Sequence, residues 1–187
     1  MKTKLIISDF DGTLVDTKEA NFQAYKEVLS HFDFLLTKEI YHQVFGMRLK
    51  EFMHYININD PFIIEQVRNM KAQIYPQYFE LIRINTPLLE FIALMRLNGV
   101  KTALASTAQK DNVFNLLNHI NQSQLFDLIV TGANVVKAKP DPECFLSIMA
   151  YFNCKAEETL IFEDSFVGIK AAIQSQAQYI QIKKNIH

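Results

Sequence analysis

The sequence predicts an α/β fold, with a parallel sheet of about five strands that carries helices on both faces. Five short apolar runs are typical of buried strands, and helical patterns separate the last four of them. Apolar strands that alternate with helices are typical of a parallel sheet covered on both sides. The expected strands are residues 5–8, 102–105, 128–131, 160–162 and 179–182.

Each expected helix of this sheet shows one apolar face. Apolar side chains recur there at the three- and four-residue spacing that places them on one side of a helix. The four faces comprise Leu88, Leu89, Ile92, Leu94 and Met95; Val113, Leu116, Leu117 and Ile120; Phe145, Ile148, Met149 and Phe152; and Val167, Ile169, Ala171, Ala172 and Ile173.

The segment from about residue 18 to residue 85 interrupts this alternation. It shows helical stretches at 20–32 and 63–84 and no convincing strand, and Pro76 is expected to break or kink the second stretch. Turns are expected at Gly46 and at 57–61. We therefore predict an α/β catalytic core of residues 1–16 and 86–187, with a helical insertion at 17–85.

The composition limits the classes of function. A length of 187 residues suggests one domain, or one domain with a large insertion, and a hydrophobic content of 49% is ample for a core. The net charge of −1 gives no support to a nucleic-acid or membrane partner, and no stretch approaches the roughly 18 apolar residues of a membrane span. Cys144 and Cys154 lack a metal or redox spacing, so we expect reduced thiols in a cytoplasmic protein.

Two carboxylates follow the first expected strand. Asp9 and Asp11 stand one residue apart, directly after the apolar run and before Gly12. Packing alone does not explain them, because an isolated charge is costly to bury. The pair is better explained by a divalent cation, by covalent catalysis, or by both.

Further polar groups follow the other strands. Ser106 and Thr107 follow the second strand, Glu163 and Asp164 follow the fourth, and Lys139 lies in the segment between the third and fourth. In an open parallel sheet, ligands bind beyond the carboxyl ends of the strands. Carboxylates at this density need a hard cation such as Mg²⁺, and a lysine and a hydroxyl suit phosphate oxygens.

Four motifs then resemble the haloacid dehalogenase-like (HAD) superfamily, which consists mostly of Mg²⁺-dependent phosphatases and phosphotransferases. The resemblance implies a Rossmann-like core, and the insertion resembles the helical cap of the subgroup that contains phosphoglycolate phosphatase and β-phosphoglucomutase. In order, the motifs are residues 9–14, Ser106 after 103–105, Lys139 with Pro140, and 163–172.

The resemblance implies a reaction through an aspartyl-phosphate. Asp9 would be the nucleophile, and Asp11 would protonate the leaving oxygen and then take a proton from water. Asp9, the backbone carbonyl of Asp11, Glu163 and Asp164 would hold Mg²⁺. Because dehalogenases of the superfamily lack an Asp at the position of Asp11, its presence favours phosphoryl transfer.

Five further residues are candidate phosphate or substrate contacts. Ser106 and Lys139 would hold the transferring phosphoryl oxygens, with Thr107 beside them. Thr13 would orient the loop or meet the leaving group, and Arg48 would contact substrate from the cap.

Simpler interpretations stay open for several of these residues. Ser106 could serve an ordinary turn or helix N-cap, and Asp164 could cap the helix that begins near residue 166. Lys137 is a rival for the role of Lys139, and Arg48 could lie on a solvated helix face.

The predicted function is that of a Mg²⁺-dependent phosphatase that hydrolyses a small phosphomonoester. A compact helical cap favours a small diffusible ester over a protein or nucleic acid, and we expect a monomer or weak homodimer. The alternatives are a phosphomutase on the same scaffold, a non-catalytic phospho-acceptor module and a catalytically inactive relative. Asn21 counts against a mutase, because the mutase relatives carry a histidine there.

Overall fold

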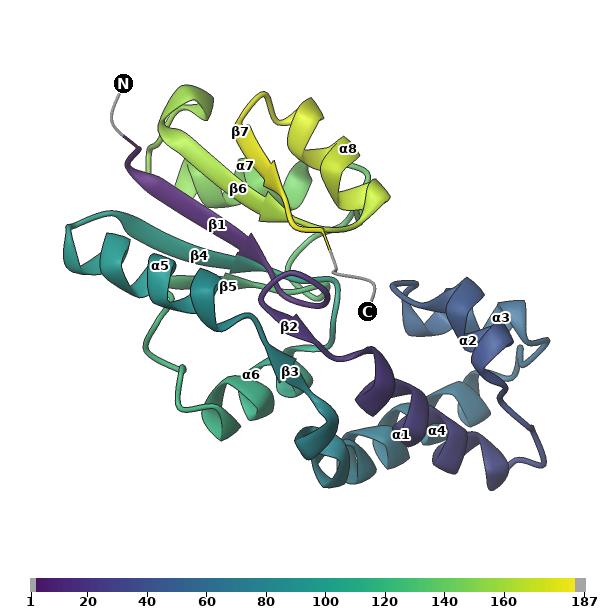
Figure 1. Ribbon diagram of the computed structural model, residues 1–187. Coiled ribbons are helices and arrows are strands. Elements are labelled where there is room, and N and C mark those ends of the chain that lie inside the picture. The colour runs from purple at the N-terminus through teal and green to yellow at the C-terminus, as the bar shows by residue number, and fades with distance from the viewer. Residues whose placement is uncertain (1–2, 184–187) are drawn as a thin grey trace. The chain divides into compact units, whose positions relative to one another are not determined.

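The computed structural model describes residues 3–183 (Figure 1). The chain divides into two compact units, one formed by Met1–Asp16 with Ile84–His187 and the other by Thr17–Arg83. The assignment of the first as catalytic core and of the second as cap stays a prediction. Within residues 3–183, no helix combines the length and apolar character that a membrane crossing requires.

A parallel sheet forms the centre of the first unit. Its five strands within the described residues follow the order β5-β4-β1-β6-β7. This arrangement confirms the predicted α/β, Rossmann-like fold class. The strands are β1 (Leu5–Asp9), β4 (Lys101–Ala105), β5 (Leu128–Val130), β6 (Thr159–Glu163) and β7 (Gln178–Gln181).

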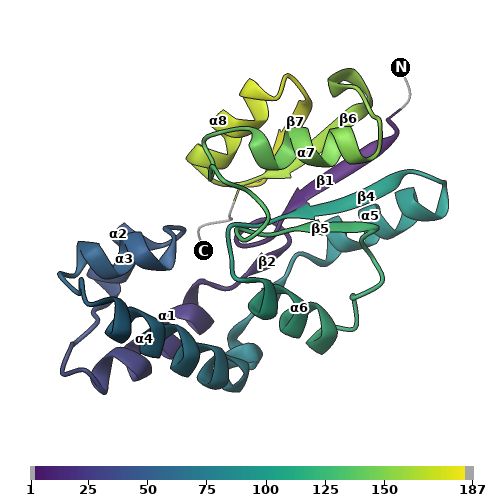
Figure 2. The same ribbon diagram turned by 180° about the vertical axis from the view of Figure 1, so that it is seen from behind.

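Helices cover both faces of this sheet. Figures 1 and 2 show α5 (Thr86–Leu97) and α6 (Lys110–His119) on one face, with α7 (Glu143–Tyr151) and α8 (Phe166–Gln174) on the other. A short 3₁₀ helix, η2 (Ala156–Glu158), leads into β6. Most residues of the predicted apolar faces are buried or half-buried, but Leu94, Val167 and Ile173 are exposed, so the prediction is wrong for these three, which lie at the solvent side of α5 and α8.

The central strand β1 is buried along its whole length. Leu5 and Ile7 join Phe145 and Ile161 in one apolar cluster beneath α7 and α8. Each fully buried side chain of this size contributes about 1.5–3 kcal/mol. Parallel pairing then aligns the strands in register, with Asp9 beside Ala105 and Ser8 beside Phe162. The residues that follow β1, β4 and β6 are thereby brought to one edge of the sheet.

A second, two-stranded sheet corrects one expectation. β2 (Val15–Asp16) pairs with β3 (Arg83–Ile84), so the prediction of no strand between 18 and 85 is wrong at the end of that segment. The two residues of β3 are both exposed. A strand of that length shows no alternation of polar and apolar residues, which is the signal that identifies strands.

The second unit is otherwise helical, as expected. Its aromatic core includes Phe22, Tyr41 and Phe52, all buried. The elements are α1 (Lys18–Ser30), α2 (Lys38–Val44), α3 (Leu49–Tyr55), α4 (Pro61–Ile74) and the 3₁₀ helix η1 (Tyr75–Leu81).

Pro76 breaks the long helical pattern as predicted. The α-helical part ends at Ile74, and the chain continues as a 3₁₀ helix with Pro76 in its first turn. Proline removes a backbone donor, so the α-helical hydrogen bonding cannot continue through it. The expected turns are also present, with positive φ at Gly46 (90°) and at Asn57 (62°).

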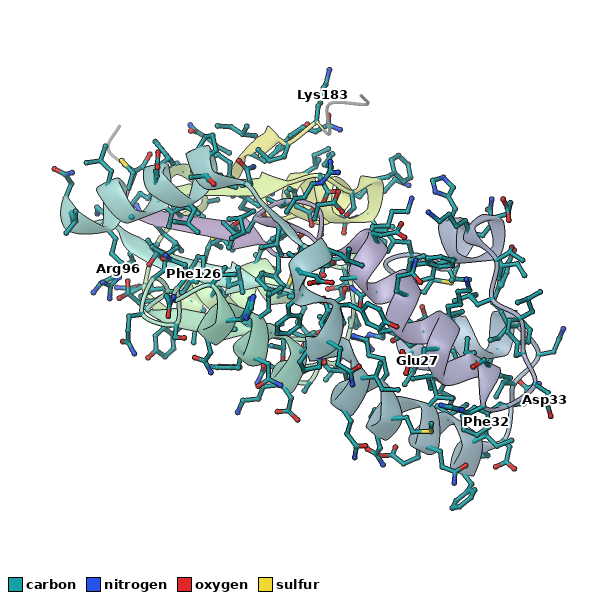
Figure 3. All side chains as sticks on the ribbon, turned by 60° about the horizontal axis from the view of Figure 1, so that its bottom comes forward. Glu27, Phe32, Asp33, Arg96, Phe126 and Lys183 are labelled. Atoms are coloured by element: carbon teal, nitrogen blue, oxygen red, sulfur yellow. The ribbon has the colours of Figure 1, made fainter. Side chains whose placement is uncertain are left out.

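Polar side-chain contacts tether elements to one another on the surface of each unit. On the second unit, Tyr78 Oη donates to Glu27 Oε2 at 2.5 Å, which ties η1 to α1. On the first, Arg96 Nη2 pairs with Asp127 Oδ1 at 3.0 Å at the end of α5. Figure 3 labels Glu27 on the ribbon of α1 and places Arg96 near Phe126. Pairs as exposed as Arg96 with Asp127 stabilise a fold by about 0–1 kcal/mol, so these tethers are minor.

Candidate active site

Asp9 ends β1 and is buried, with 7% of its surface exposed. Its Oδ1 accepts a hydrogen bond from Lys139 Nζ at 2.7 Å. Burial raises the pKa of Asp9 well above its ordinary value, and the Glu163 and Asp11 carboxylates act in the same direction, while Lys139 opposes them. Asp9 therefore needs a positive charge beside it to stay ionised in this buried position.

Lys139 supplies that charge from the loop before α7. Its side chain is 4% exposed, and its Nζ donates to Asp9 Oδ1 at 2.7 Å, Glu163 Oε1 at 2.7 Å and the Ala105 carbonyl at 3.2 Å. An ammonium has three N–H donors, so these acceptors fix its orientation. Burial alone would lower the pKa of Lys139, but the two carboxylates outweigh burial and hold the pKa above its ordinary value.

The rival lysine lies elsewhere. The Lys137 side chain is 71% exposed and pairs only loosely with Asp141, at 3.5 Å. Of the two, the structure brings Lys139 to Asp9.

Glu163 ends β6 and is completely buried. Its Oε1 accepts from Lys139, and its Oε2 accepts from the Ser165 backbone N–H at 2.9 Å and from Ser165 Oγ at 3.1 Å. Ser165 is also the N-cap of α8, because its Oγ accepts from Gly168 N at 3.0 Å. The alternative that Asp164 caps this helix is therefore wrong.

Asp164 completes a cluster of carboxylates that suits a divalent cation. Asp9, Glu163 and Asp164 each offer one oxygen, and these oxygens lie within 4.8 Å of one another. Thr13 Oγ1 donates to Asp164 Oδ1 at 3.1 Å. Gly12 has φ +100°, and a Cβ there would overlap the Asp164 carboxylate, so glycine permits this approach of the loop. Hard oxygen ligands in excess over one lysine are typical of a site for a hard divalent cation.

Asp11 and Ser106 lie side by side at the same edge. Ser106 Oγ donates to Asp11 Oδ2 at 3.3 Å and accepts from Ala108 N at 3.0 Å. The serine therefore stabilises its own turn and at the same time contacts Asp11, a candidate acid/base. Thr107 follows in that loop and is half-buried. Its carbonyl packs against Gly132, where an added Cβ would come within 2.7 Å.

Arg48 belongs to the second unit, where it occupies the N-cap position of α3. Its Nε and Nη2 atoms are buried without a hydrogen-bond partner among the described residues. A buried guanidinium nitrogen without a partner is unusual, since buried polar groups are nearly always hydrogen-bonded. The interpretation of Arg48 as an ordinary solvated residue is not supported by this burial.

Sequence reasoning missed two residues that support the site. Asn85 Nδ2 donates to the Thr13 carbonyl at 3.1 Å, and its N–H donates to the Leu14 carbonyl at 2.9 Å, so Asn85 holds the loop that follows β1. It is also the N-cap of α5. Asn before Thr-Pro at a helix start is an N-cap signal that could have identified Asn85, whereas Asp164 and Ser165 both precede the helix that begins at 166 and the sequence does not separate them.

Cys144, on α7, is buried near Asp9, Lys139 and Glu163. Both cysteines are free thiols. Burial raises the pKa of Cys144 to about 11. Since the thiolate is the reactive form, we expect iodoacetamide at pH 8 to label Cys144 at least ~10-fold more slowly in the native protein than in urea. Peptide mass spectrometry over time would measure this rate. Equal rates in the two states would contradict the buried placement.

Comparison with known proteins identifies the family of this chain. The model of the haloacid dehalogenase-like hydrolase family matches residues 6–182. The chain belongs to the haloacid dehalogenase-like hydrolases. This HAD hydrolase is therefore an enzyme, and the predicted family is confirmed.

Relatives of this HAD hydrolase are phosphatases and phosphomutases. A phosphorylated carbohydrates phosphatase of Thermotoga maritima is 27% identical over 175 residues, which cover 89% of this chain and 79% of that protein. A β-phosphoglucomutase of Bacillus subtilis is 25% identical, with 90% and 78% covered. The crystal structure of CbbY from Rhodobacter sphaeroides in complex with phosphate shares the fold, with a TM-score of 0.86, 23% identity, and 95% and 84% covered.

Proposed function

We propose that this HAD hydrolase is a Mg²⁺-dependent phosphatase that hydrolyses a small phosphomonoester through an aspartyl-phosphate on Asp9. One observation carries the proposal: a buried carboxylate at the end of the central strand is held by a lysine that also binds a second buried acid. Phosphatase relatives support the reaction class.

Each of these site residues has a distinct role in the proposed reaction. Asp9 attacks phosphorus, and Lys139 orients the Asp9 carboxylate and balances its charge. Asp11 protonates the leaving oxygen and then takes a proton from the attacking water. Asp9, Asp164, Glu163 and the Asp11 carbonyl would hold Mg²⁺. When bound, Mg²⁺ lowers the repulsion between a carboxylate and a phosphate dianion.

The remaining site residues are proposed to bind the substrate. Ser106 and Thr107 donate to phosphoryl oxygens, and Thr13 positions the loop after β1 or meets the leaving group. Arg48 is a proposed substrate contact, supported by its buried nitrogens without partners and by the suitability of a guanidinium for phosphate. We further propose a small-molecule ester, a cytoplasmic location, and a monomer or weak homodimer.

The test is phosphate release from a panel of small phosphomonoesters, sugar phosphates and phosphoglycolate included, with Mg²⁺ or with EDTA. Wild-type protein is expected to release phosphate only with Mg²⁺. Asp9→Asn is expected to lower kcat by roughly three orders of magnitude or more, because it removes the nucleophile. A thermal melt of the variant checks that it is folded.

Other outcomes would separate the alternatives. Isomerised product with little free phosphate, dependent on a bisphosphate activator, would identify a phosphomutase. Full activity of a folded Asp9→Asn variant would exclude the aspartyl-phosphate. Activity on phosphoproteins or polynucleotides, with none on small esters, would exclude the proposed substrate class.

A further inference from the structure

We infer that Ser165 is a positioning residue for catalysis: it orients Glu163, and through Glu163 it fixes Lys139 against Asp9. The inference rests on the proposed phosphatase function and adds a residue to it. Ser165 itself contacts neither Asp9 nor Lys139 in any of the hydrogen bonds described above. Its effect must therefore pass through the Glu163 carboxylate.

The hydrogen bonds of Ser165 direct its hydroxyl proton to one acceptor, the Glu163 carboxylate. The Ser165 Oγ accepts from Gly168 N at 3.0 Å, which places its lone pair toward the helix, and donates its proton to Glu163 Oε2 at 3.1 Å. The Ser165 backbone N–H donates to the same oxygen at 2.9 Å. One oxygen of Glu163 is thus held by two donors from a single residue.

The other Glu163 oxygen transmits this orientation. Oε1 accepts from Lys139 at 2.7 Å, and Lys139 reaches Asp9 Oδ1 at the same distance. Because both Glu163 oxygens are engaged and the side chain is completely buried, a rotation of the carboxylate would move the lysine with it. Gly168 packs directly against this carboxylate, since an added Cβ there would overlap Glu163.

This chain of contacts predicts which kinetic constant changes. A displaced Lys139 would weaken the charge balance that the reaction needs and its expected hold on the transferring phosphoryl group, where charge develops in the transition state, while Ser106, Thr107 and Arg48 stay in place. Loss of the Ser165 hydroxyl should therefore lower kcat and leave KM nearly unchanged. Partners that orient a reacting group from behind typically contribute about 10- to 100-fold to activity.

The experiment compares Ser165→Gly with Ser165→Thr in the full chain. Glycine is a tolerated N-cap, so Ser165→Gly removes the donor at little cost to the helix. We expect kcat to fall at least about 10-fold in Ser165→Gly and to stay within about threefold of wild type in Ser165→Thr, which keeps a hydroxyl. Thr37→Gly is the matched control, because Thr37 caps α2 through Ile40 N and the carboxylate that its side chain also contacts, Glu39, is not one of the proposed site residues.

Three results would overturn the inference. They are an unchanged kcat in Ser165→Gly, equal losses in the Gly and Thr variants, and an equal loss in the Thr37→Gly control. A crystal structure of Ser165→Gly decides the matter independently of activity. We expect Glu163 to rotate and the Lys139–Asp9 distance to lengthen from 2.7 Å; unchanged positions would contradict the inference. If wild type hydrolyses no ester, the proposed function fails, and the crystal structure still tests the positioning.

Discussion

Lys139→Met is expected to lower kcat/KM for phosphate-ester hydrolysis by roughly 100- to 1,000-fold, the usual loss when one preorganised electrostatic contact is removed from an active site. Methionine keeps much of the side-chain volume and removes the charge. Lys139 is the cation that contacts both Asp9 and Glu163, at 2.7 Å each. Without it, two buried carboxylates face each other, and the nucleophile loses its orientation. Steady-state kinetics on the best ester would measure the loss.

The same substitution should destabilise the metal-free protein. Removing one partner of a buried ion pair costs about 3–5 kcal/mol, because the remaining charge stays buried. The pKa of Asp9 is already raised by burial, and losing Lys139 raises it further. A group whose pKa is raised in the folded state stabilises the fold while protonated, and that stability is lost as pH rises through the folded pKa. Urea unfolding in EDTA should therefore show a larger deficit, relative to wild type, at pH 8 than at pH 5.

Lys137→Met is the matched control for this prediction. Lys137 is exposed, and its pair with Asp141 spans 3.5 Å. Exposed pairs of this kind contribute about 0–1 kcal/mol, so we expect near wild-type stability and activity. A larger kinetic loss at Lys137 than at Lys139 would contradict the assignment of the site lysine.

The parallel sheet and the edge that carries the site could be predicted from sequence, because a strand buried in the core leaves an apolar run in the sequence. A strand covered on both faces is continuously apolar, and β1, β4 and β6 each end where polar residues begin. Parallel pairing then brings those ends together. The identity of the site lysine could not be predicted in this way. Lys137 and Lys139 are two residues apart in a loop, and loop side chains follow no periodicity that separates a buried residue from an exposed one.

The support beneath the site was also not predicted. Two-residue strands such as β2 and β3 are too short to show an alternation of polar and apolar residues. Whether Asp164 or Ser165 caps α8 depends on the residue at which that helix begins. Asp164 and Ser165 are both good N-caps, so sequence alone left the cap open. Only the structure shows that Ser165 takes the cap, which leaves the Asp164 carboxylate in the acidic cluster.

Gly168→Ala is expected to destabilise the protein by about 1–3 kcal/mol, the usual cost of overpacking a core, and to lower activity strongly. This result is opposite to ordinary helix behaviour, because alanine in a helix interior is favoured over glycine by about 1 kcal/mol. Here the added Cβ would overlap the Glu163 carboxylate. That carboxylate cannot move aside easily, since it is completely buried and held by Lys139 at 2.7 Å and by Ser165 at 2.9 Å.

A double-mutant cycle tests the cause of that loss. In a Glu163→Ala background the overlap is removed, so Gly168→Ala should cost nothing there, or stabilise by its helix preference. Lys170→Ala, at an exposed position of the same helix, is the control; it removes only a surface contact with the Phe166 ring and should change stability by less than about 1 kcal/mol. Urea unfolding of the four proteins gives the coupling energy. If Gly168→Ala is equally costly with and without Glu163, the small residue at 168 serves the packing of α8 itself, and the close approach to Glu163 is not what requires glycine.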